Sequence, residues 1–185
     1  IQIRQFPMRL SSDGKTLEKV FDEYIDKGAV VIPEGVTLIR DISFYNCKEL
    51  TQVTLPKGLT SIGYSAFSGC TKLTQITLPE GLTSIVDLAF RGCTKLTQIT
   101  LPEGLASIGK SAFRDCTNLT QITFPKGLTS IGEGVFAGCS NLKEIIINTV
   151  SDDELARIKA LLPSEHRDKV IKNPVYSEVL EFQNG

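Results

Sequence analysis

The sequence contains a single histidine, His166, and its formal net charge at pH 7 is only −1. A nucleophilic cysteine or serine needs a nearby base, and one histidine near the C-terminal end gives little basis for such a pair. A net charge near zero creates no overall attraction to nucleic acid or to an anionic membrane surface. No apolar run is long enough to span a bilayer. We therefore expect a protein that is not an enzyme, does not bind nucleic acid and does not insert into a membrane.

Motifs for metals and cofactors are absent as well. The five cysteines are single residues far apart in the sequence, whereas zinc sites use closely spaced C-x₂₋₄-C pairs. The sequence also has no glycine-rich loop of the kind that binds phosphate groups. We expect neither a cofactor nor a metal.

What the sequence does contain is an internal repeat. Its cysteines lie at a constant interval of 23 residues: Cys47, Cys70, Cys93, Cys116 and Cys139. Pro33, Gly35, Ile39 and Phe44 each begin a series of five identical residues at the same interval. Repeats of 20 to 50 residues are typical of solenoid proteins, in which each repeat forms one coil.

One coil, read from Leu50, is LTQVTLPKGLTSIGYSAFSGCTK. Alternation predicts a strand in which Val53 points inward while Gln52 and Thr54 point outward. Pro56 lacks an N–H and ends the strand. The following Leu and Ile form a second inward pair on the return path, and Ala-Phe fits a short helical turn. Stacked coils with one strand each would form one parallel sheet with strands about 4.8 Å apart.

The combined pattern L-x-x-I-x-L-P and I-x-x-x-A-F-x-x-C resembles the BspA-type (Treponema-type) leucine-rich repeats. The resemblance covers residues 28–149, as five repeats plus a sixth strand at LKEIIINT. It implies an α/β solenoid: a short, curved leucine-rich repeat with one parallel sheet and 23-residue coils. In one respect the sequence departs from many such repeats. Pro-Glu-Gly or Pro-Lys-Gly follows the strand where others place an asparagine ladder, so the backbone groups there need different partners.

Both ends of the solenoid are expected to be covered by helices, because an open solenoid exposes its core. In residues 1–27, the apolar residues of TLEKVFDEYIDKG recur at helical spacing and predict an amphipathic cap helix. In residues 150–185, Ser151 and Glu154 have the spacing of a capping box, which predicts a cap helix followed by a tail. The outermost stretches, IQIRQFPMRL and NPVYSEVLEFQNG, alternate in part and are interpreted as edge strands or ordered tails.

The five cysteines are predicted to be small buried hydrophobic residues. Stacking would place them about 4.8 Å apart, which lies within the Cα separation of a disulfide. Equivalent side chains in a stack point in parallel, however, and five is an odd number, so we expect reduced, inward-facing thiols. Such thiols persist most easily in a reducing compartment, which favours a cytosolic place of action.

The outward strand positions form a neutral polar strip. The resemblance implies that this sheet face is concave and is the usual binding surface. We predict a partner-binding site composed of Gln52, Thr54, Gln75, Thr77, Gln98, Thr100, Gln121 and Thr123. The face should be rigid, with each strand hydrogen-bonded on both sides. A competing interpretation is structural, because threonine suits exposed strands and stacked Gln and Thr pairs support a sheet.

Two other surfaces differ from this strip. Ala29, Val31 and Ile146 replace its polar residues at the ends, and we expect the terminal segments to cover them. A mildly basic edge near the cysteine turns comprises Lys48, Lys72, Lys95, Arg91 and Arg114. We interpret this edge as an ordinary mixed, solvated surface, with a second binding surface as the alternative.

Together these features predict a monomeric, non-catalytic protein-protein interaction module. The resemblance, to a family of mostly adhesion and host-interaction proteins, implies a secreted bacterial effector or surface protein that engages a host partner. Such a protein would be secreted, delivered into a host cytosol, or held on the bacterial surface. One alternative is the substrate-recruiting domain of a larger enzyme such as a ligase-type effector. The residues after Thr149 are too few for a catalytic domain, so this alternative requires sequence beyond this chain. Another is a carbohydrate- or ice-binding Thr/Gln surface.

Overall fold

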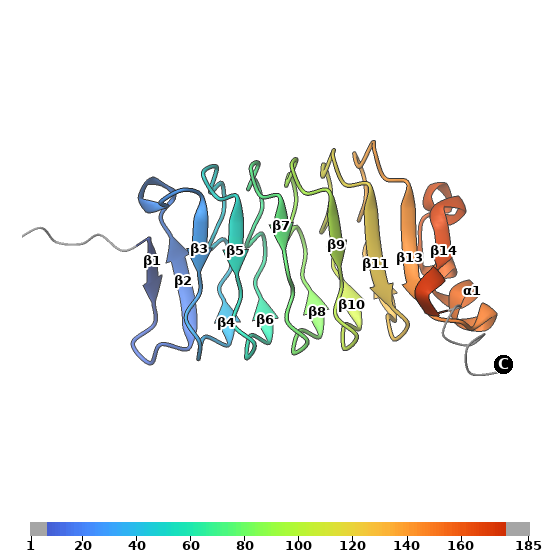
Figure 1. Ribbon diagram of the computed structural model, residues 1–185, viewed down its shortest axis with the longest axis horizontal. Helices are drawn as coiled ribbons and strands as arrows, with labels where there is room; N and C mark the ends of the chain where they lie inside the picture. Colours follow the sequence, from blue (N-terminus) through green and yellow to red (C-terminus); the bar gives the residue numbers. More distant parts are fainter. Residues whose placement is uncertain (1–6, 177–185) are drawn as a thin grey trace, which may run out of the picture.

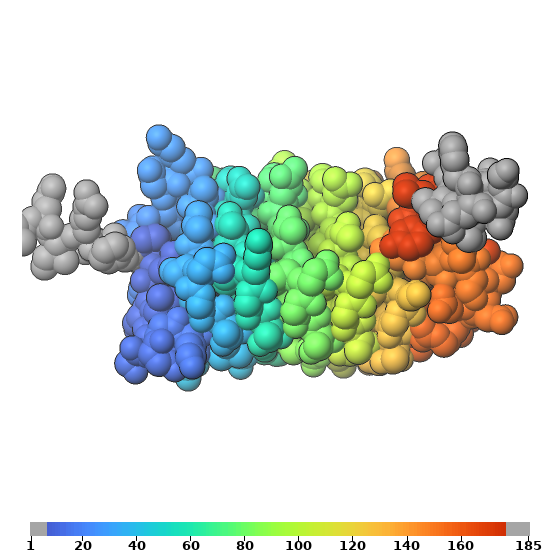
Figure 2. All heavy atoms as spheres, turned by 60° about the horizontal axis from the view of Figure 1, so that its bottom comes forward, coloured from blue at the N-terminus to red at the C-terminus, as the bar shows by residue number. Residues whose placement is uncertain are grey.

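The computed structural model describes residues 7–176 and is a solenoid whose coils lie side by side (Figure 1). The space-filling view shows the same order as adjacent bands that run from the N-terminal strands to the C-terminal helix (Figure 2). Most coils contribute two short strands, one to each of two rows. Neighbouring coils are offset by 23 residues, as in the hydrogen bond that the Thr74 hydroxyl donates to the Thr51 carbonyl.

The first row consists of parallel strands in two hydrogen-bonded sheets, ordered β3-β5-β7 and β14-β13-β11-β9. Its strands are β3 (Ala29–Val31), β5 (Gln52–Thr54), β7 (Gln75–Ile76), β9 (Gln98–Thr100), β11 (Gln121–Pro125), β13 (Glu144–Asn148) and β14 (Val170–Lys172). Equivalent residues face each other across coils, with Gln52 opposite Gln75 and Gln98 opposite Gln121. The register therefore keeps the glutamines in one column on the outer face.

The second row lies on the return path of each coil, in sheets ordered β1-β2-β4-β6 and β12-β10-β8. Its strands are β1 (Met8–Leu10), β2 (Thr16–Val20), β4 (Leu38–Ile39), β6 (Ser61–Ile62), β8 (Ser84–Ile85), β10 (Ser107–Ile108) and β12 (Ser130–Ile131). The prediction of one strand per coil and a single parallel sheet is therefore wrong. A constant offset brings every extended segment beside its equivalent, so the short Ser-Ile segments pair as well.

The core is a set of stacked columns inside the coils. Ile62, Phe67 and Cys70 are fully buried, like their equivalents in the next two coils. The phenylalanine rings stack along the solenoid, with centroid separations of 4.5 Å for Phe44–Phe67, 5.3 Å for Phe67–Phe90, 5.5 Å for Phe90–Phe113 and 6.0 Å for Phe113–Phe136. Stacked aromatic pairs at these distances add to the stabilisation from burial itself.

Threonine hydroxyls bond to carbonyls of the preceding coil on both turns of the solenoid. Before the first-row strands, the Thr51 hydroxyl donates to the Gly28 carbonyl (3.0 Å) and the Thr74 hydroxyl to the Thr51 carbonyl (3.2 Å). On the opposite turn, after Pro-x-Gly, the Thr60 hydroxyl donates to the Thr37 carbonyl at 3.2 Å. Each of these carbonyls also accepts a main-chain N–H, as the Thr51 carbonyl does from Thr74 at 3.1 Å, so the hydroxyls add a further bond between neighbouring coils.

The predicted N-terminal cap helix is wrong. This segment forms the antiparallel pair β1-β2, and only η1 (Asp22–Tyr24) is helical. The reason is the edge of β4. The N–H of Thr37 donates to the Lys15 carbonyl (2.8 Å) and the N–H of Arg40 donates to the Leu17 carbonyl (3.0 Å). A helix would leave these N–H groups without acceptors, whereas an extended segment pairs with them and still buries its apolar side chains.

At the other end, α1 (Asp152–Leu161) begins where the capping box places it, and the Ser151 hydroxyl accepts a hydrogen bond from the N–H of Glu154 at 3.3 Å. Ile158 is buried and joins the core. The helix is followed by η2 (Ser164–Lys169) and then by β14, which extends the first row. Of the two outermost stretches, residues 1–6 and 177–185 lie outside the described part of the chain, and β1 is an edge strand.

Candidate functional site

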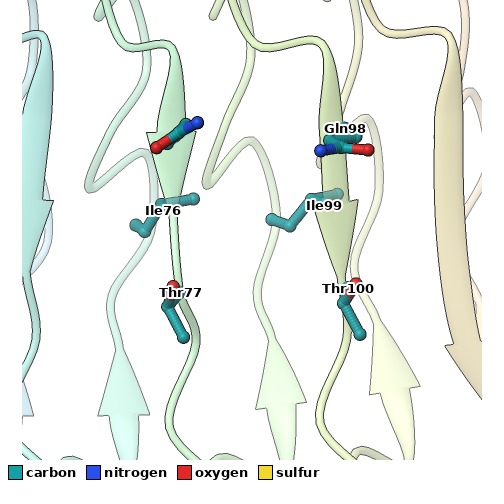
Figure 3. Close-up of a pocket in the computed structure, with 6 residues that line it drawn as sticks. Ile76, Thr77, Gln98, Ile99 and Thr100 are labelled. Carbon is teal, nitrogen blue, oxygen red and sulfur yellow. The ribbon is translucent and has the colours of Figure 1, made fainter.

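The outer face of the first row, here called the sheet face, carries the predicted binding residues. Gln98 and Thr100 project from β9 on this face, with Thr77 in the preceding coil (Figure 3). Six of the predicted residues are exposed: Gln52, Thr54, Gln75, Thr77, Gln98 and Thr100. Gln121 and Thr123 are only half exposed, and the Gln121 amide donates to the Glu144 carboxylate at 2.9 Å. The structure thus brings all eight onto one face but leaves β11 less accessible than β5, β7 and β9.

Two shallow hollows lie on the sheet face. One, of about 340 Å³, is lined by Gln75, Ile76, Thr77, Gln98, Ile99 and Thr100. The other, of about 280 Å³, is lined by Gln52, Val53, Thr54, Leu55, Lys57, Thr77 and Pro79. Thr77 borders both hollows, so together they span β5 to β9.

The first hollow coincides with an interruption in the row of strands. β7 is hydrogen-bonded to β5, and β9 to β11, but within residues 7–176 no strand pairing joins β7 to β9. The expectation that every strand is bonded on both sides is therefore wrong at the centre of the sheet face.

The flanking threonines have a structural role. The hydroxyls of Thr51, Thr74 and Thr120 each donate a hydrogen bond to a carbonyl of the preceding coil at 3.0–3.2 Å. This column therefore supports the solenoid. The Gln52 and Thr54 side chains face solvent, as both the binding and the structural interpretation expect.

The expectation that terminal segments cover the apolar ends of the strip fails at β3. Val31 is 65% exposed and Ala29 is exposed as well. At the other end Ile146 is half-buried and lies opposite Ile171 of β14. The difference arises because β14 extends the first row at its C-terminal end, whereas β1 and β2 extend only the second row.

All five cysteines are free and buried. The Cys93 thiol donates to the Phe67 carbonyl of the preceding coil at 3.2 Å, and Cys70, Cys116 and Cys139 make the same contact at 3.0–3.1 Å. Burial raises the pKa of the Cys139 thiol to about 11 and that of Cys47 to about 12. Because the thiolate is the nucleophile and the metal ligand, thiols held in the protonated form serve neither role.

His166 closes the phenylalanine stack at its C-terminal end. Its ring meets Phe136 edge-on, with centroids 5.6 Å apart and an interplanar angle of 89°. Its Nδ1 is buried without a hydrogen-bond partner, and burial lowers the pKa of the imidazole. The side chain therefore packs as a neutral aromatic ring, which the sequence alone does not indicate.

The basic edge near the cysteine turns is largely compensated by acidic neighbours. Arg91 and Arg114 lie 3.8 Å and 3.5 Å from the Asp115 carboxylate, and Lys72 forms an ion pair with Glu49 at 3.0 Å. In the part of the chain that the structure describes, no three potential ligands are grouped as a metal site requires. No helix in that part has the length and apolar character of a membrane span.

Comparisons with known proteins agree with this geometry. A family model described as the BspA type leucine rich repeat region matches residues 37–153 in six copies. The chain is 32% identical to a leucine rich repeat protein of T. pallidum, with a TM-score of 0.69 over 79% of this chain and 70% of that one.

Two further solved structures are similar. A leucine rich cell surface protein of Faecalibacterium prausnitzii is 32% identical, with a TM-score of 0.75, and the match covers 82% of this chain but only 40% of that one. The pneumococcal vaccine antigen PcpA, at 23% identity and a TM-score of 0.75 over 96% of this chain and 44% of that one, shares the fold. No curated protein matches the chain.

Proposed function

Because this chain belongs to the BspA-type leucine-rich repeat family, we propose that it is a non-catalytic module that binds a protein partner on its sheet face. Proteins of this family are generally interaction modules without catalytic activity. The partner would contact the exposed glutamine and threonine columns of β5, β7 and β9.

One observation carries this proposal. The exposed strip is hollowed from β5 to β9, uncharged along its centre, and lined by side chains that both donate and accept hydrogen bonds. The strongest contacts of a protein interface lie near its centre, where water is excluded. Gln75, Thr77, Gln98 and Thr100 occupy that position.

The proposed setting is the outside of a bacterium. BspA-like proteins are typically cell-surface or secreted, and one similar structure is described as a cell surface protein. We therefore propose secretion or surface display with a host protein as the partner. Buried thiols hydrogen-bonded inside the coils resist oxidation, so they do not require the cytosolic site of action that delivery into a host cell would provide.

Two alternatives make different predictions. A substrate-recruiting domain would work only when linked to a catalytic domain, because the described residues contain no candidate catalytic group. A carbohydrate- or ice-binding surface would use the same columns, but would bind glycans or show thermal hysteresis in the isolated protein. Both assays are direct and need no knowledge of a protein partner.

The test is differential capture. The protein is immobilised and exposed to host-cell extract, alongside the double variant Gln75→Lys and Gln98→Lys. Because these side chains point away from the core, the variant should melt within a few degrees of the parent but retain no partner. The matched control is Arg91→Glu with Arg114→Glu on the cysteine-turn edge. Capture that survives the glutamine changes and disappears with the arginine changes would place the binding surface on that edge.

A further inference from the structure

We propose that the sheet face also binds a second copy of this chain, face to face and coil to coil. The two copies would be related by a two-fold axis parallel to the solenoid axis, over the middle of the first-row strands. This inference rests on the proposed function, since it takes the sheet face as the binding surface and names one partner for it.

The first support is a pattern of charge along the two rims of the sheet face. One rim lies three residues before the glutamine of each strand and carries Glu49, Lys72 and Lys95. The opposite rim lies five residues after that glutamine and carries Lys57, Glu80 and Glu103. Within each of these three coils the two rims have opposite signs, and all six side chains are in exposed residues.

The proposed axis exchanges the two rims while keeping each coil opposite its own equivalent. Lys57 then faces Glu49 of the second copy, Glu80 faces Lys72, and Glu103 faces Lys95. These three contacts join unlike charges, and each occurs twice because the axis is two-fold. In the coil of β3 the equivalent rim residues, Asp26 and Glu34, are both acidic, and their two like-charge contacts oppose association there. Reversing the order of the coils about the same centre would instead place Lys72 on Lys72 and Glu80 on Glu80. Complementary charge of this kind fixes the register between partners.

The rim groups are already ordered along the solenoid. The Lys72 ammonium is bonded to the Glu49 carboxylate at 3.0 Å. The Glu80 carboxylate accepts a hydrogen bond from the N–H of Glu103 at 3.2 Å. A second copy would therefore add charge contacts to side chains whose positions are already restrained, which reduces the entropy lost on association.

The second support comes from the centre of the face. The same axis places Gln52 opposite Thr54 of the second copy, and the glutamines of β7 and β9 opposite the threonines at 77 and 100. An amide and a hydroxyl can each donate and accept, so every such pair is complementary in both directions. Within residues 7–176 these glutamine and threonine side chains make no internal hydrogen bond, unlike the adjacent Thr51 and Gln121.

The third support is the apolar end of the strip. Val31 is 65% exposed and adjoins exposed Ala29 on the same strand. The axis brings Val31 onto Ala29 of the second copy, and Ala29 onto Val31. Burying them removes apolar surface from water at one end of the interface.

The expected interface is small. Five coils at about 4.8 Å and a strip about 25 Å wide give roughly 600 Å² on each copy, or about 1,200 Å² in total. That total lies at the lower end of specific interfaces. We therefore expect a reversible dimer whose population depends on concentration and on salt.

The test is a charge exchange followed by sedimentation equilibrium in low-salt buffer, from about 1 μM to about 1 mM. Glu80→Lys alone should weaken the dimer by about tenfold or more, because two attractive contacts become repulsive. Lys72→Glu alone should do the same. Mixing the two variants should restore dimerisation, because each then offers the charge that the other lacks. Glu133→Lys, on the opposite side of the coil, is the matched control and should change nothing.

Each other outcome overturns the inference. A parent protein that stays monomeric throughout the range excludes a second copy as partner, while capture of a host protein by the same face would remain intact. A dimer that Glu80→Lys leaves unchanged excludes the proposed register. Failure of the mixed variants to associate, with both variants folded, excludes the direct Lys72–Glu80 contact.

Discussion

The Sγ of Cys93 lies 3.2 Å from the carbonyl oxygen of Phe67 in the preceding coil. That oxygen also accepts the N–H of Cys70, at 3.2 Å. The thiol thus uses the second lone pair of a buried carbonyl and links two coils without a covalent bond. The same arrangement recurs for Cys70, Cys116 and Cys139, which is a physical reason for a cysteine in every coil.

The thiols should be inert in the folded protein. Burial raises the pKa of Cys139 to about 11 and that of Cys93 well above its ordinary value, so almost no thiolate is present at pH 8. Titration with a thiol reagent should proceed slowly under native conditions and should reveal all five thiols after unfolding without reductant. A disulfide between Cys70 and Cys93 in the purified protein would contradict this assignment.

Cys93→Ala should destabilise the solenoid by about 1–3 kcal/mol, because it removes a hydrogen bond to a buried carbonyl and leaves a small void. Urea unfolding followed by spectroscopy at several wavelengths measures this change in the free energy of unfolding. Cys47→Ala is the matched control and should cost less, because its thiol lies 3.9 Å from the Val20 carbonyl, a weak contact. Equal losses at both positions would show that the thiol–carbonyl contact contributes little.

Replacing Ile42 should stabilise the protein. Its φ of 56° is strained for a β-branched residue, and its side chain is 50% exposed, so little packing is lost. The equivalent position in the fifth coil is Gly134, with a φ of 65°. Ile42→Asn should add about 1 kcal/mol, because asparagine tolerates this conformation. Tyr45→Asn, on the same exposed turn without a positive φ, is the control. A lower urea midpoint for Ile42→Asn would refute the strain.

The stability of the C-terminal end should fall in mild acid. Burial lowers the pKa of His166 below its ordinary value of 6.5, despite nearby Glu165 and Asp168, which raise it. The unfolded chain therefore binds a proton at His166 more readily than the folded chain does. The contribution of the neutral ring to the free energy of unfolding is complete above about pH 6.5 and is lost as the pH falls through the folded pKa. Melting temperatures should drop from pH 7.5 to pH 5, and less in His166→Phe. Identical profiles would show that the histidine is not buried as described.

Removing residues 1–27 should expose the edge of β4 and the core beneath it. The N–H groups of Thr37 and Arg40 would lose the acceptors they have in the intact chain. Open strand edges associate, so we expect a lower melting temperature and aggregation. Adding Glu80→Lys to the deletion separates this effect from association through the sheet face. A monomeric deletion with unchanged melting would mean that β1 and β2 do not protect the solenoid.

The repeat made much of the core predictable. Ile62, Phe67 and Cys70 each belong to a series with a fixed interval, and each is fully buried. The Ser151–Glu154 spacing also locates the start of α1, because a capping box depends only on local geometry. The second row of strands was harder to predict from the sequence. Ser61–Ile62 has two residues and cannot show alternation, so it becomes a strand only through its neighbours.

The N-terminal segment shows how tertiary contacts decide between two local patterns. Leu17 and Val20 have a spacing that fits a helix, yet both are buried in the strand β2. The N–H groups at the edge of β4 require an extended segment as their partner, so this segment forms a strand although its pattern also fits a helix. β2 pairs with β4 at an offset of 22 residues, with Leu17 opposite Ile39, so the 23-residue interval did not indicate this strand.

The stacking of Phe67, Phe90 and Phe113 at nearly equal separations has a consequence for how such a chain evolves. Each coil meets only the coils beside it, and the surfaces it offers to them are nearly the same throughout. Excising residues 75–97 would therefore place Phe67 beside Phe113 across a junction much like the original ones. Unequal recombination between such near-identical stretches of gene can change the number of coils without creating a new kind of contact. Length is then a trait that selection can adjust in whole units, and with it the number of glutamine and threonine pairs available to a partner.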